Sequence, residues 1–299
     1  MSDFKKKYLK FVKKQEYSGE KFQDKQKQLK YFYLPFCKKI FELYKFKNRP
    51  FVIGLSGGQG SGKSTISQIL KIIFHSYFNL NVACFSIDDF YKTALERRKM
   101  SHSVHPLFLT RGVPGTHDCK MLYNVLRALL KKNFKSVRIP KFDKSIDDRF
   151  KPQYWQKILK KPDIIILEGW CVGAKPQKLK ELKKPVNILE KHEDTKLTWR
   201  KKVNNELKTS YKKIYDLIDK KIYLKVPNFK YVLKWRLLQE KKLRSRSKKK
   251  GTMNTKQIKR FIMFYERLTK NMSKSYQDND FIISIDKRHK IRSIKILNV

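Results

Sequence analysis

The chain has 299 residues, of which 40% are hydrophobic, and this composition excludes a disordered protein and predicts a folded globular one. Lysine and arginine number 72 against 26 aspartate and glutamate residues, so the formal net charge is +46 and the protein should attract anions. The basic residues are spread over the whole chain, as a general drift toward lysine also produces, so we do not expect nucleic acid as the partner.

The N-terminal region predicts helices outside the main domain. Residues 1–28 are polar and rich in lysine and glutamine, which indicates a loosely held helix or coil. Residues 29–46 carry apolar and aromatic side chains at near-helical spacing around Pro35. We therefore expect residues 1–48 to form a helical extension that packs on a main domain of residues 49–299.

The segment 51–65, FVIGLSGGQGSGKST, contains a phosphate-binding loop. Residues 57–64 match the pattern GxxxxGK(S/T), with an apolar strand before it and an amphipathic helix after it. Such a loop turns its backbone N–H groups toward a triphosphate, the lysine reaches the β- and γ-phosphates, and the following hydroxyl binds Mg²⁺. The residues expected to bind ATP here are Gly57, Gly58, Gln59, Gly60, Ser61, Gly62, Lys63, Ser64 and Thr65.

The rest of the chain alternates between strand and helix patterns. Strands are predicted at 81–87, 137–140, 164–167, 185–190 (or a strand-like turn), 221–226 and 281–285. Helices are predicted at 121–130, 194–220, 229–243 and 255–269, and polar loops at 92–118 and 142–150. Together these elements predict a three-layer α/β fold with a mostly parallel central sheet flanked by helices.

Acidic residues follow two of the buried strands. Asp88 and Asp89 follow the strand at 81–87, and Glu168 ends the strand at 164–167. Ligands of open parallel sheets bind beyond the carboxyl ends of the strands. Beside a phosphate-binding loop, such acids are suited to holding Mg²⁺ or to accepting a proton from an attacking hydroxyl.

The remaining composition limits the location and the cofactors. The four cysteines are widely spaced and no Cys/His group has zinc spacing, which predicts free thiols in a reducing compartment. There is no signal-peptide pattern and no apolar run of about 18 residues. We therefore expect a cytoplasmic protein with no membrane partner, and nothing in the sequence indicates its oligomeric state.

Several motifs in unbroken order resemble the D-glycerate 3-kinase family, a branch of the P-loop small-molecule kinases related to uridine kinase, phosphoribulokinase and pantothenate kinase. The motifs are GLSGGQGSGKST, SIDDFY, RGVPGTHD, FDKSIDDR, ILEGWCVGA, TWRKKVN, WRLLQE and RFIMFYERLT. Plant members carry a longer, glycine-containing version of the FDKS loop, and the shorter loop here is similar to that of a bacterial and fungal group.

The resemblance implies ATP-dependent, Mg²⁺-requiring phosphorylation of D-glycerate, a small hydroxy acid. It implies that Lys63, Asp88 and Glu168 are catalytic, with Asp88 near the acceptor hydroxyl as the base and Glu168 at the Walker B position, where it holds Mg²⁺ with Ser64. The residues that it places on the acceptor side are Asp89, Tyr91, Arg111, His117 and Asp118.

A basic segment near the end of the helix at 229–243 is a candidate lid. Residues 243–250, LRSRSKKK, precede Gly251, so we expect a lid near 243–252. A kinase must exclude water during transfer, and Arg244 and Arg246 could close on the β- and γ-phosphates. A solvated basic loop is the alternative interpretation.

Two other functions stay open at this point. One is a related P-loop kinase whose acceptor is a nucleoside or a pantothenate-like compound. The other is a basic P-loop ATPase that binds nucleic acid, which would show binding that weakens steeply with salt.

Overall fold

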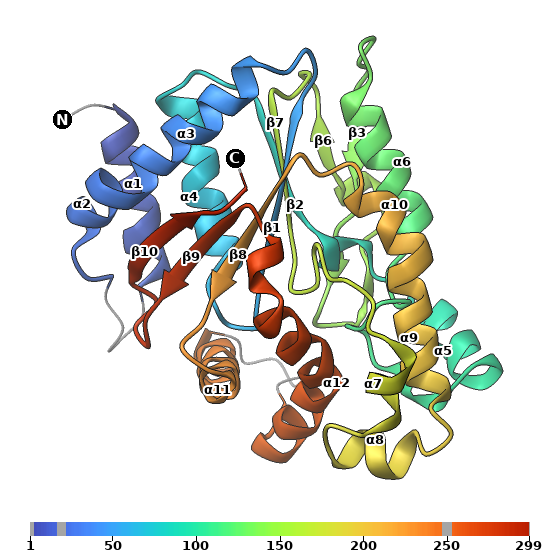
Figure 1. Ribbon diagram of the computed structural model, residues 1–299. Helices are drawn as coiled ribbons and strands as arrows, with labels where there is room; N and C mark the ends of the chain where they lie inside the picture. The colour runs from blue at the N-terminus through green and yellow to red at the C-terminus, as the bar shows by residue number, and fades with distance from the viewer. Residues whose placement is uncertain (1–2, 17–21, 247–252, 299) are drawn as a thin grey trace.

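A six-stranded sheet forms the middle layer of the structure, a computed structural model that describes residues 3–16, 22–246 and 253–298. The strands lie in the order β10–β9–β8–β1–β7–β2 (Figure 1). All neighbours pair in parallel except β10, which is antiparallel to β9. Their bounds are β1 Phe51–Gly57, β2 Val82–Ser86, β7 Ile164–Glu168, β8 Lys220–Lys225, β9 Phe281–Ile285 and β10 Ile291–Ile296. The sheet confirms the predicted α/β fold.

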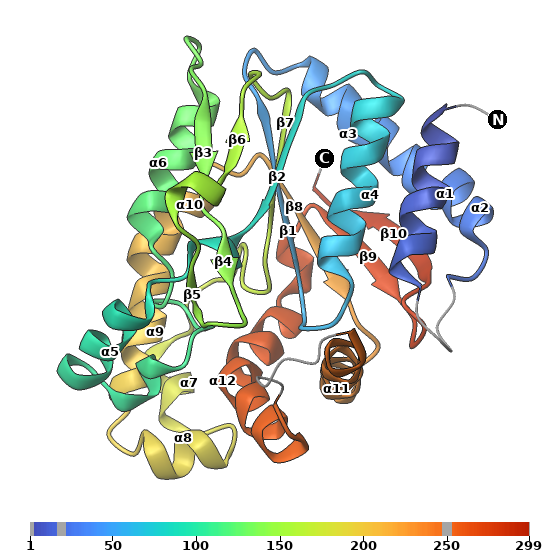
Figure 2. The same cartoon turned by 180° about the vertical axis from the view of Figure 1, so that it is seen from behind.

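Helices cover both faces of the sheet (Figures 1 and 2). On β1, Val52 packs into one core while Phe51 and Ile53 pack into the other, because successive side chains point to opposite faces. One face is covered by α1 (Asp3–Gln15), α3 (Leu34–Lys45) and α4 (Lys63–Ser76). The other is covered by α6 (Cys119–Leu130), α9 (Thr198–Glu206), α10 (Lys212–Tyr215) and α12 (Thr255–Lys274). Burial on both faces explains the continuous apolar runs in the strands.

The register of the central strands aligns three carboxyl ends. Glu168 of β7 lies opposite Leu55 of β1 on one side and opposite Ser86 of β2 on the other. The phosphate-binding loop after β1, the turn after β2 and the end of β7 therefore meet at one edge, which we call the carboxyl edge of the sheet.

The first helix is packed more firmly than the sequence indicated. Tyr8 and Val12 of α1 are buried, and the Tyr8 hydroxyl donates to the Lys25 carbonyl over 3.0 Å. The prediction of a loosely held segment over residues 1–28 is therefore wrong for α1. The short α2 (Lys25–Gln28) leads through a π-helical turn (Leu29–Tyr33) into α3. The amide of Gln28 also bonds to both backbone groups of Ile291, at 3.1 and 2.9 Å, which ties this region to β10.

The segment 92–118 is structured, although the sequence predicted a long loop. It contains α5 (Ala94–Ser103) and a 3₁₀ turn (Pro106–Leu109). A capping box begins α5, because Thr93 accepts from the Glu96 N–H and Glu96 accepts from the Thr93 N–H. Two small antiparallel sheets follow α6: β3 (Val137–Ile139) pairs with β6 (Gln156–Ile158), and between them β4 (Phe142–Asp143) and β5 (Asp148–Arg149) form a hairpin.

Two later predictions need correction, and one strand was missed. The segment 185–190 is not a strand, because Asn187 caps α8 (Ile188–Glu193), which follows the short α7 (Leu179–Lys183). The predicted helix at 194–220 is divided into α9, a π-helical turn (Leu207–Tyr211) and α10. The sequence also did not predict β10. Three further 3₁₀ turns lie at Ile87–Phe90, Pro152–Tyr154 and Tyr276–Asp278.

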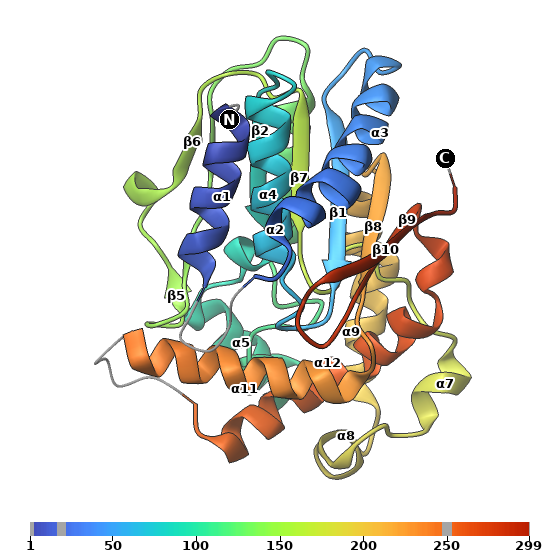
Figure 3. The same cartoon turned by 90° about the vertical axis from the view of Figure 1, so that its left-hand side faces the viewer.

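The last part of the carboxyl edge is formed by α11 (Phe229–Arg246), which crosses below the ends of the strands (Figure 3). The predicted lid near 243–252 lies largely outside the described residues, and so do the side chains of Arg244 and Arg246. Their role stays a prediction. Among the helices in the described ranges, none is long and apolar enough to cross a membrane.

Candidate active site

Lys63 lies at the start of α4 and folds back over the phosphate-binding loop. Its Nζ donates to the carbonyls of Gly57 and Gly58, at 3.0 and 2.9 Å. Burial lowers the pKa of Lys63, and the negative charges of Glu168 and Asp88 oppose that shift. The three predicted catalytic residues are therefore close enough to act on one another electrostatically.

The loop itself is built to surround an anion. Gly62, with φ of 89°, is the N-cap of α4, a backbone conformation that favours glycine. The side-chain nitrogen and oxygen of Gln59 and Oγ of Ser61 are buried without a hydrogen-bond partner among the described residues. Thr65 lies in the first turn of α4. Unpaired donors beside a helix N-terminus fit the phosphates of ATP.

The floor of the loop packs directly on α11. A Cβ atom on Gly60 would lie 2.6 Å from Cβ of Trp235, so only glycine fits there. The ring of His289, from the turn between β9 and β10, packs at a tilt against Trp235 with centroids 4.1 Å apart, and its Nε2 lies 2.7 Å from the Gly60 carbonyl. No local sequence pattern predicts these contacts, since they join segments far apart in the chain.

Ser64 and Glu168 form the candidate Mg²⁺ site. The Ser64 hydroxyl donates to Oε1 of Glu168 over 2.8 Å. Burial raises the pKa of Glu168, while the charge of Lys63 opposes the shift. A hydroxyl and a carboxylate are the hard oxygen ligands that Mg²⁺ prefers, so the pair fits the ion. In the described ranges no group of three or more His, Cys, Asp or Glu side chains is placed to hold a metal.

Asp88 lies in the turn after β2, next to this pair. Its carboxylate accepts from the Tyr91 hydroxyl over 2.9 Å and from Nζ of Lys144 over 2.7 Å. Burial favours a higher pKa for Asp88, but the charge and hydrogen bond of Lys144 and the hydrogen bond from Tyr91 together hold the pKa below its usual range. Asp88 is thus an ionised carboxylate, as a proton acceptor must be. Lys144 belongs to the FDKS motif, but the sequence analysis assigned it no role.

Asp89 and Asp118 both bond to backbone groups. Asp89 accepts from the N–H groups of Ser86 and Phe142, at 3.3 and 3.5 Å, and burial raises its pKa to about 6. Asp118 caps α6 by accepting from the Met121 N–H over 3.0 Å. Their predicted contact with the acceptor stays a prediction.

His117 is held by two tyrosines. Its ring stacks on Tyr91 with centroids 4.4 Å apart, and its Nδ1 lies 2.5 Å from the Tyr211 hydroxyl. That hydroxyl already accepts from the Gly115 N–H over 3.1 Å, so it can donate its own proton to Nδ1, and we assign the imidazole proton to Nε2. Burial lowers the pKa of His117 to about 4. His117 is therefore a neutral donor whose Nε2 is buried without a partner among the described residues.

Arg111, which the sequence predicts on the acceptor side, is held by an acidic partner. Its guanidinium is ion-paired with the Asp147 carboxylate in the turn between β4 and β5. Arg97 of α5 binds the same carboxylate at 2.8 Å. Nothing in the sequence around Arg97 distinguished it from the other basic residues of the chain.

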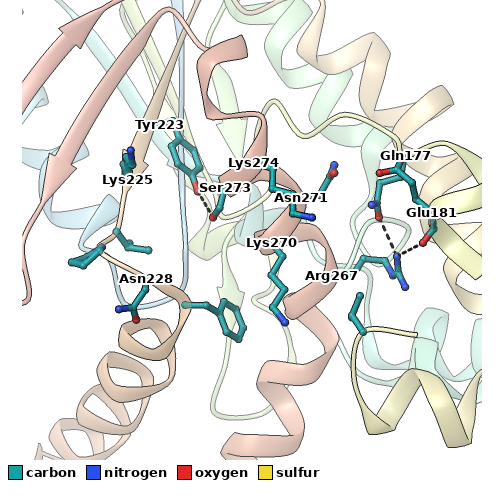
Figure 4. A pocket seen from close by; sticks show the side chains of 14 residues that line it. Gln177, Glu181, Tyr223, Lys225, Asn228, Arg267, Lys270, Asn271, Ser273 and Lys274 are labelled. Atoms are coloured by element: carbon teal, nitrogen blue, oxygen red, sulfur yellow. Dashed lines mark hydrogen bonds between the residues drawn. The ribbon is translucent and has the colours of Figure 1, made fainter. Parts of the chain in front are cut away.

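A hollow of about 490 Å³ lies elsewhere at the carboxyl edge, between the end of β8 and α12 (Figure 4). Tyr223, Lys225, Asn271 and Lys274 are among its lining residues. Arg267 also lines it, but its guanidinium is bound within the protein by Gln177, Glu181, Lys184 and Glu190. None of the predicted site residues lines this hollow.

Comparisons with known proteins agree with the geometry. The family model of the phosphoribulokinase/uridine kinase family matches residues 52–206. An uncharacterised kinase of Schizosaccharomyces pombe, mug58, is 35% identical over 227 residues, covering 73% of this chain and 79% of the relative. The chloroplastic D-glycerate 3-kinase of Arabidopsis thaliana is 30% identical over 256 residues, covering 80% of this chain but 53% of the plant protein. A solved D-glycerate 3-kinase from Cryptococcus neoformans shares the fold, with a TM-score of 0.71, 24% identity and coverage of 88% of this chain and 97% of that one.

Proposed function

The chain belongs to the phosphoribulokinase/uridine kinase family of P-loop kinases, and we propose that it transfers the γ-phosphoryl group of ATP to D-glycerate, forming 3-phosphoglycerate. The named activity of the Arabidopsis thaliana relative supports this acceptor. The observation that carries the proposal is the convergence of Lys63, Asp88 and Glu168 at one edge of the sheet, with His117 near Asp88. Arg111 lies over the Phe142 ring, which packs against Tyr91.

The nucleotide side of the site has three tasks. The loop amides and Lys63 bind the β- and γ-phosphates, where the lysine exchanges its bonds to the loop carbonyls for bonds to phosphate oxygens. Ser64 and Glu168 would hold Mg²⁺, which would supply positive charge to neutralise the phosphates. The side chains at the carboxyl edge would then keep the γ-phosphate facing Asp88.

The acceptor side positions a hydroxyl against that phosphate. Asp88, oriented by the Tyr91 hydroxyl, accepts the proton of the acceptor hydroxyl. The hydroxyl oxygen of the acceptor then bonds to the γ-phosphorus while the bond between that phosphorus and the β-phosphate oxygen breaks and releases ADP. His117 donates from Nε2 to an acceptor oxygen. Arg111 binds the acceptor carboxylate, since a guanidinium matches a carboxylate with two parallel hydrogen bonds.

A coupled assay of ADP release with a panel of acceptors tests the proposal. The panel contains D-glycerate, L-glycerate, lactate, uridine and pantothenate, and Lys63→Met is the control variant for contaminating kinases. We expect ADP release that depends on D-glycerate and on Lys63. Turnover with uridine or pantothenate instead would make the protein a kinase of a different acceptor. A preparation that binds ATP but shows no turnover with any hydroxy acid contradicts the proposal.

A further inference from the structure

Arg97 and Arg111 converge on a single carboxylate that belongs to the protein itself. Nη2 of Arg97 donates to Oδ2 and to the carbonyl of Asp147, both over 2.8 Å, and its Nη1 donates to Oδ1 over 3.3 Å. Arg111 donates to the same Oδ1 through Nη1. Two positive guanidinium groups thus share one negative charge.

The two arginines lie on anchored parts of the fold. The side chain of Arg97 is 1% exposed and projects from α5, whose first turn is fixed by a capping box. The backbone carbonyl of Arg111 accepts from the Tyr265 hydroxyl over 3.3 Å, and the next carbonyl, that of Gly112, accepts from Trp170 over 2.9 Å. Both guanidinium groups lie over the Phe142 ring, at 5.8 and 5.5 Å from its centroid.

The carboxylate, in contrast, lies on an exposed turn. The Asp147 side chain is 47% exposed, and its backbone has φ of 57°, a left-handed conformation that is unfavourable for aspartate compared with glycine. The hairpin that carries it is short: Phe142 pairs with Arg149 and Asp143 with Asp148, and the Phe150 N–H donates to the Lys141 carbonyl over 2.9 Å. The guanidinium pair is therefore the rigid partner and the carboxylate is the replaceable one.

The guanidinium pair of Arg97 and Arg111 is close to Asp88, the candidate base. The Phe142 ring packs edge-on against Tyr91, with centroids 5.2 Å apart, and Tyr91 donates to Asp88. In the same hairpin, Lys144 covers the Asp88 carboxylate. The turn between β4 and β5 thus places the Lys144 ammonium against Asp88 and the Asp147 carboxylate against the two arginines. A bound hydroxy acid would place its hydroxyl at the first of these positions and its carboxylate at the second.

We propose that Arg97 and Arg111 form a carboxylate subsite for the acceptor, and that Asp147 fills this subsite as an internal substitute that the acceptor's carboxylate displaces. This inference rests on the proposed function, which it deepens by adding Arg97 as a residue that selects carboxylate acceptors. Because a competing internal ligand reduces the fraction of protein able to bind, it weakens the apparent affinity for the acceptor.

Asp147→Asn removes the competing charge, and Asp148→Asn is the matched control. Asp148 lies in the same hairpin and loses the same charge, but its carboxylate bonds to the neighbouring Arg149 N–H instead of to the guanidinium pair. We expect Asp147→Asn to lower the KM for D-glycerate about tenfold and to leave the KM for ATP unchanged. Asp148→Asn should change the KM for D-glycerate by less than about twofold. The dissociation constants for D-glycerate and for its amide, measured by calorimetry, should show that only carboxylate binding tightens.

Arg97→Lys provides a second measurement, because lysine keeps the charge but loses the two-pronged geometry. We expect it to raise the KM for D-glycerate with less effect on kcat, and Asp147→Asn alone decides the matter if this variant does not fold. An equal effect of Asp147→Asn and Asp148→Asn, a rise in KM with Asp147→Asn, or no carboxylate binding by any form overturns the inference. Tighter carboxylate binding by Asp147→Asn without turnover of D-glycerate would leave the inference standing and refute the proposed function. Turnover of D-glycerate together with equal effects of Asp147→Asn and Asp148→Asn on its KM would support the proposed function and refute the inference.

Discussion

Replacing Asp88 with asparagine separates its role in phosphoryl transfer from a role in nucleotide binding. Asparagine has the same size and can still accept from the Tyr91 hydroxyl, so the local packing should survive. It cannot accept a proton, and the Lys144 ammonium loses its charged partner. Loss of a general base costs about 10²- to 10⁴-fold in rate, and we expect kcat to fall by that amount. The charge of Asp88 acts on Lys63 only at a distance, so the affinity for ATP should change by less than about threefold.

The assay combines steady-state ADP release with calorimetric titration of ATP and Mg²⁺. Asp148→Asn again serves as the control for a lost negative charge, and it should keep the wild-type kcat. A fall in ATP affinity that parallels the fall in kcat would mean that Asp88 is a metal ligand or a structural residue. Wild-type turnover by Asp88→Asn would refute the assignment of the base.

Three further predictions concern the surroundings of the base. Gly112→Ala should lower the free energy of unfolding, measured with urea, by about 1–3 kcal/mol. Gly112 has φ of 138°, and a Cβ atom there would lie 2.1 Å from the Tyr265 hydroxyl. An unchanged urea midpoint would contradict this close approach. Glu168→Gln should raise the Mg²⁺ concentration for half-maximal activity about 10- to 100-fold, and an unchanged Mg²⁺ dependence would remove Glu168 from the metal site. Burial lowers the pKa of His117 to about 4 in the folded protein, against 6.5 for an ordinary histidine. Between these two pH values the unfolded chain therefore binds more protons than the folded one. The contribution of the neutral His117 to the free energy of unfolding is complete above about pH 6.5 and is lost as the pH falls toward 4. Unfolding free energies should therefore fall by about 3 kcal/mol more for the wild type than for His117→Gln between pH 6.5 and 4, and parallel profiles would argue against a buried neutral imidazole.

The parts of the site that follow from the sequence are those fixed by local patterns. Residues 57–64 carry the spacing of glycines, lysine and serine that is typical of a loop between a strand and a helix. The buried runs before Asp88 and Glu168 predicted parallel strands, and parallel strands bring their carboxyl ends to one edge. These features need no knowledge of distant contacts.

The parts that could not be predicted depend on partners far away in the chain. Helix α5 was missed because its amphipathic pattern is weak and the buried side chain on its inner face is an arginine, whose partner Asp147 lies 50 residues later. The same limit applies to Lys144, which pairs with Asp88 across 56 residues, and to Tyr211, which reaches His117 across 94. By contrast, the capping box at Thr93 was a readable signal for α5.

Transfer of a phosphoryl group to a small hydroxy acid can be followed by ³¹P NMR of the wild-type protein incubated with ATP, Mg²⁺ and D-glycerate. We expect the γ-phosphate signal to be replaced by that of a phosphomonoester on C3 of glycerate, in an amount equal to the ADP formed. Formation of inorganic phosphate alone, or a γ-phosphate signal that persists in protein able to bind ATP, would contradict it.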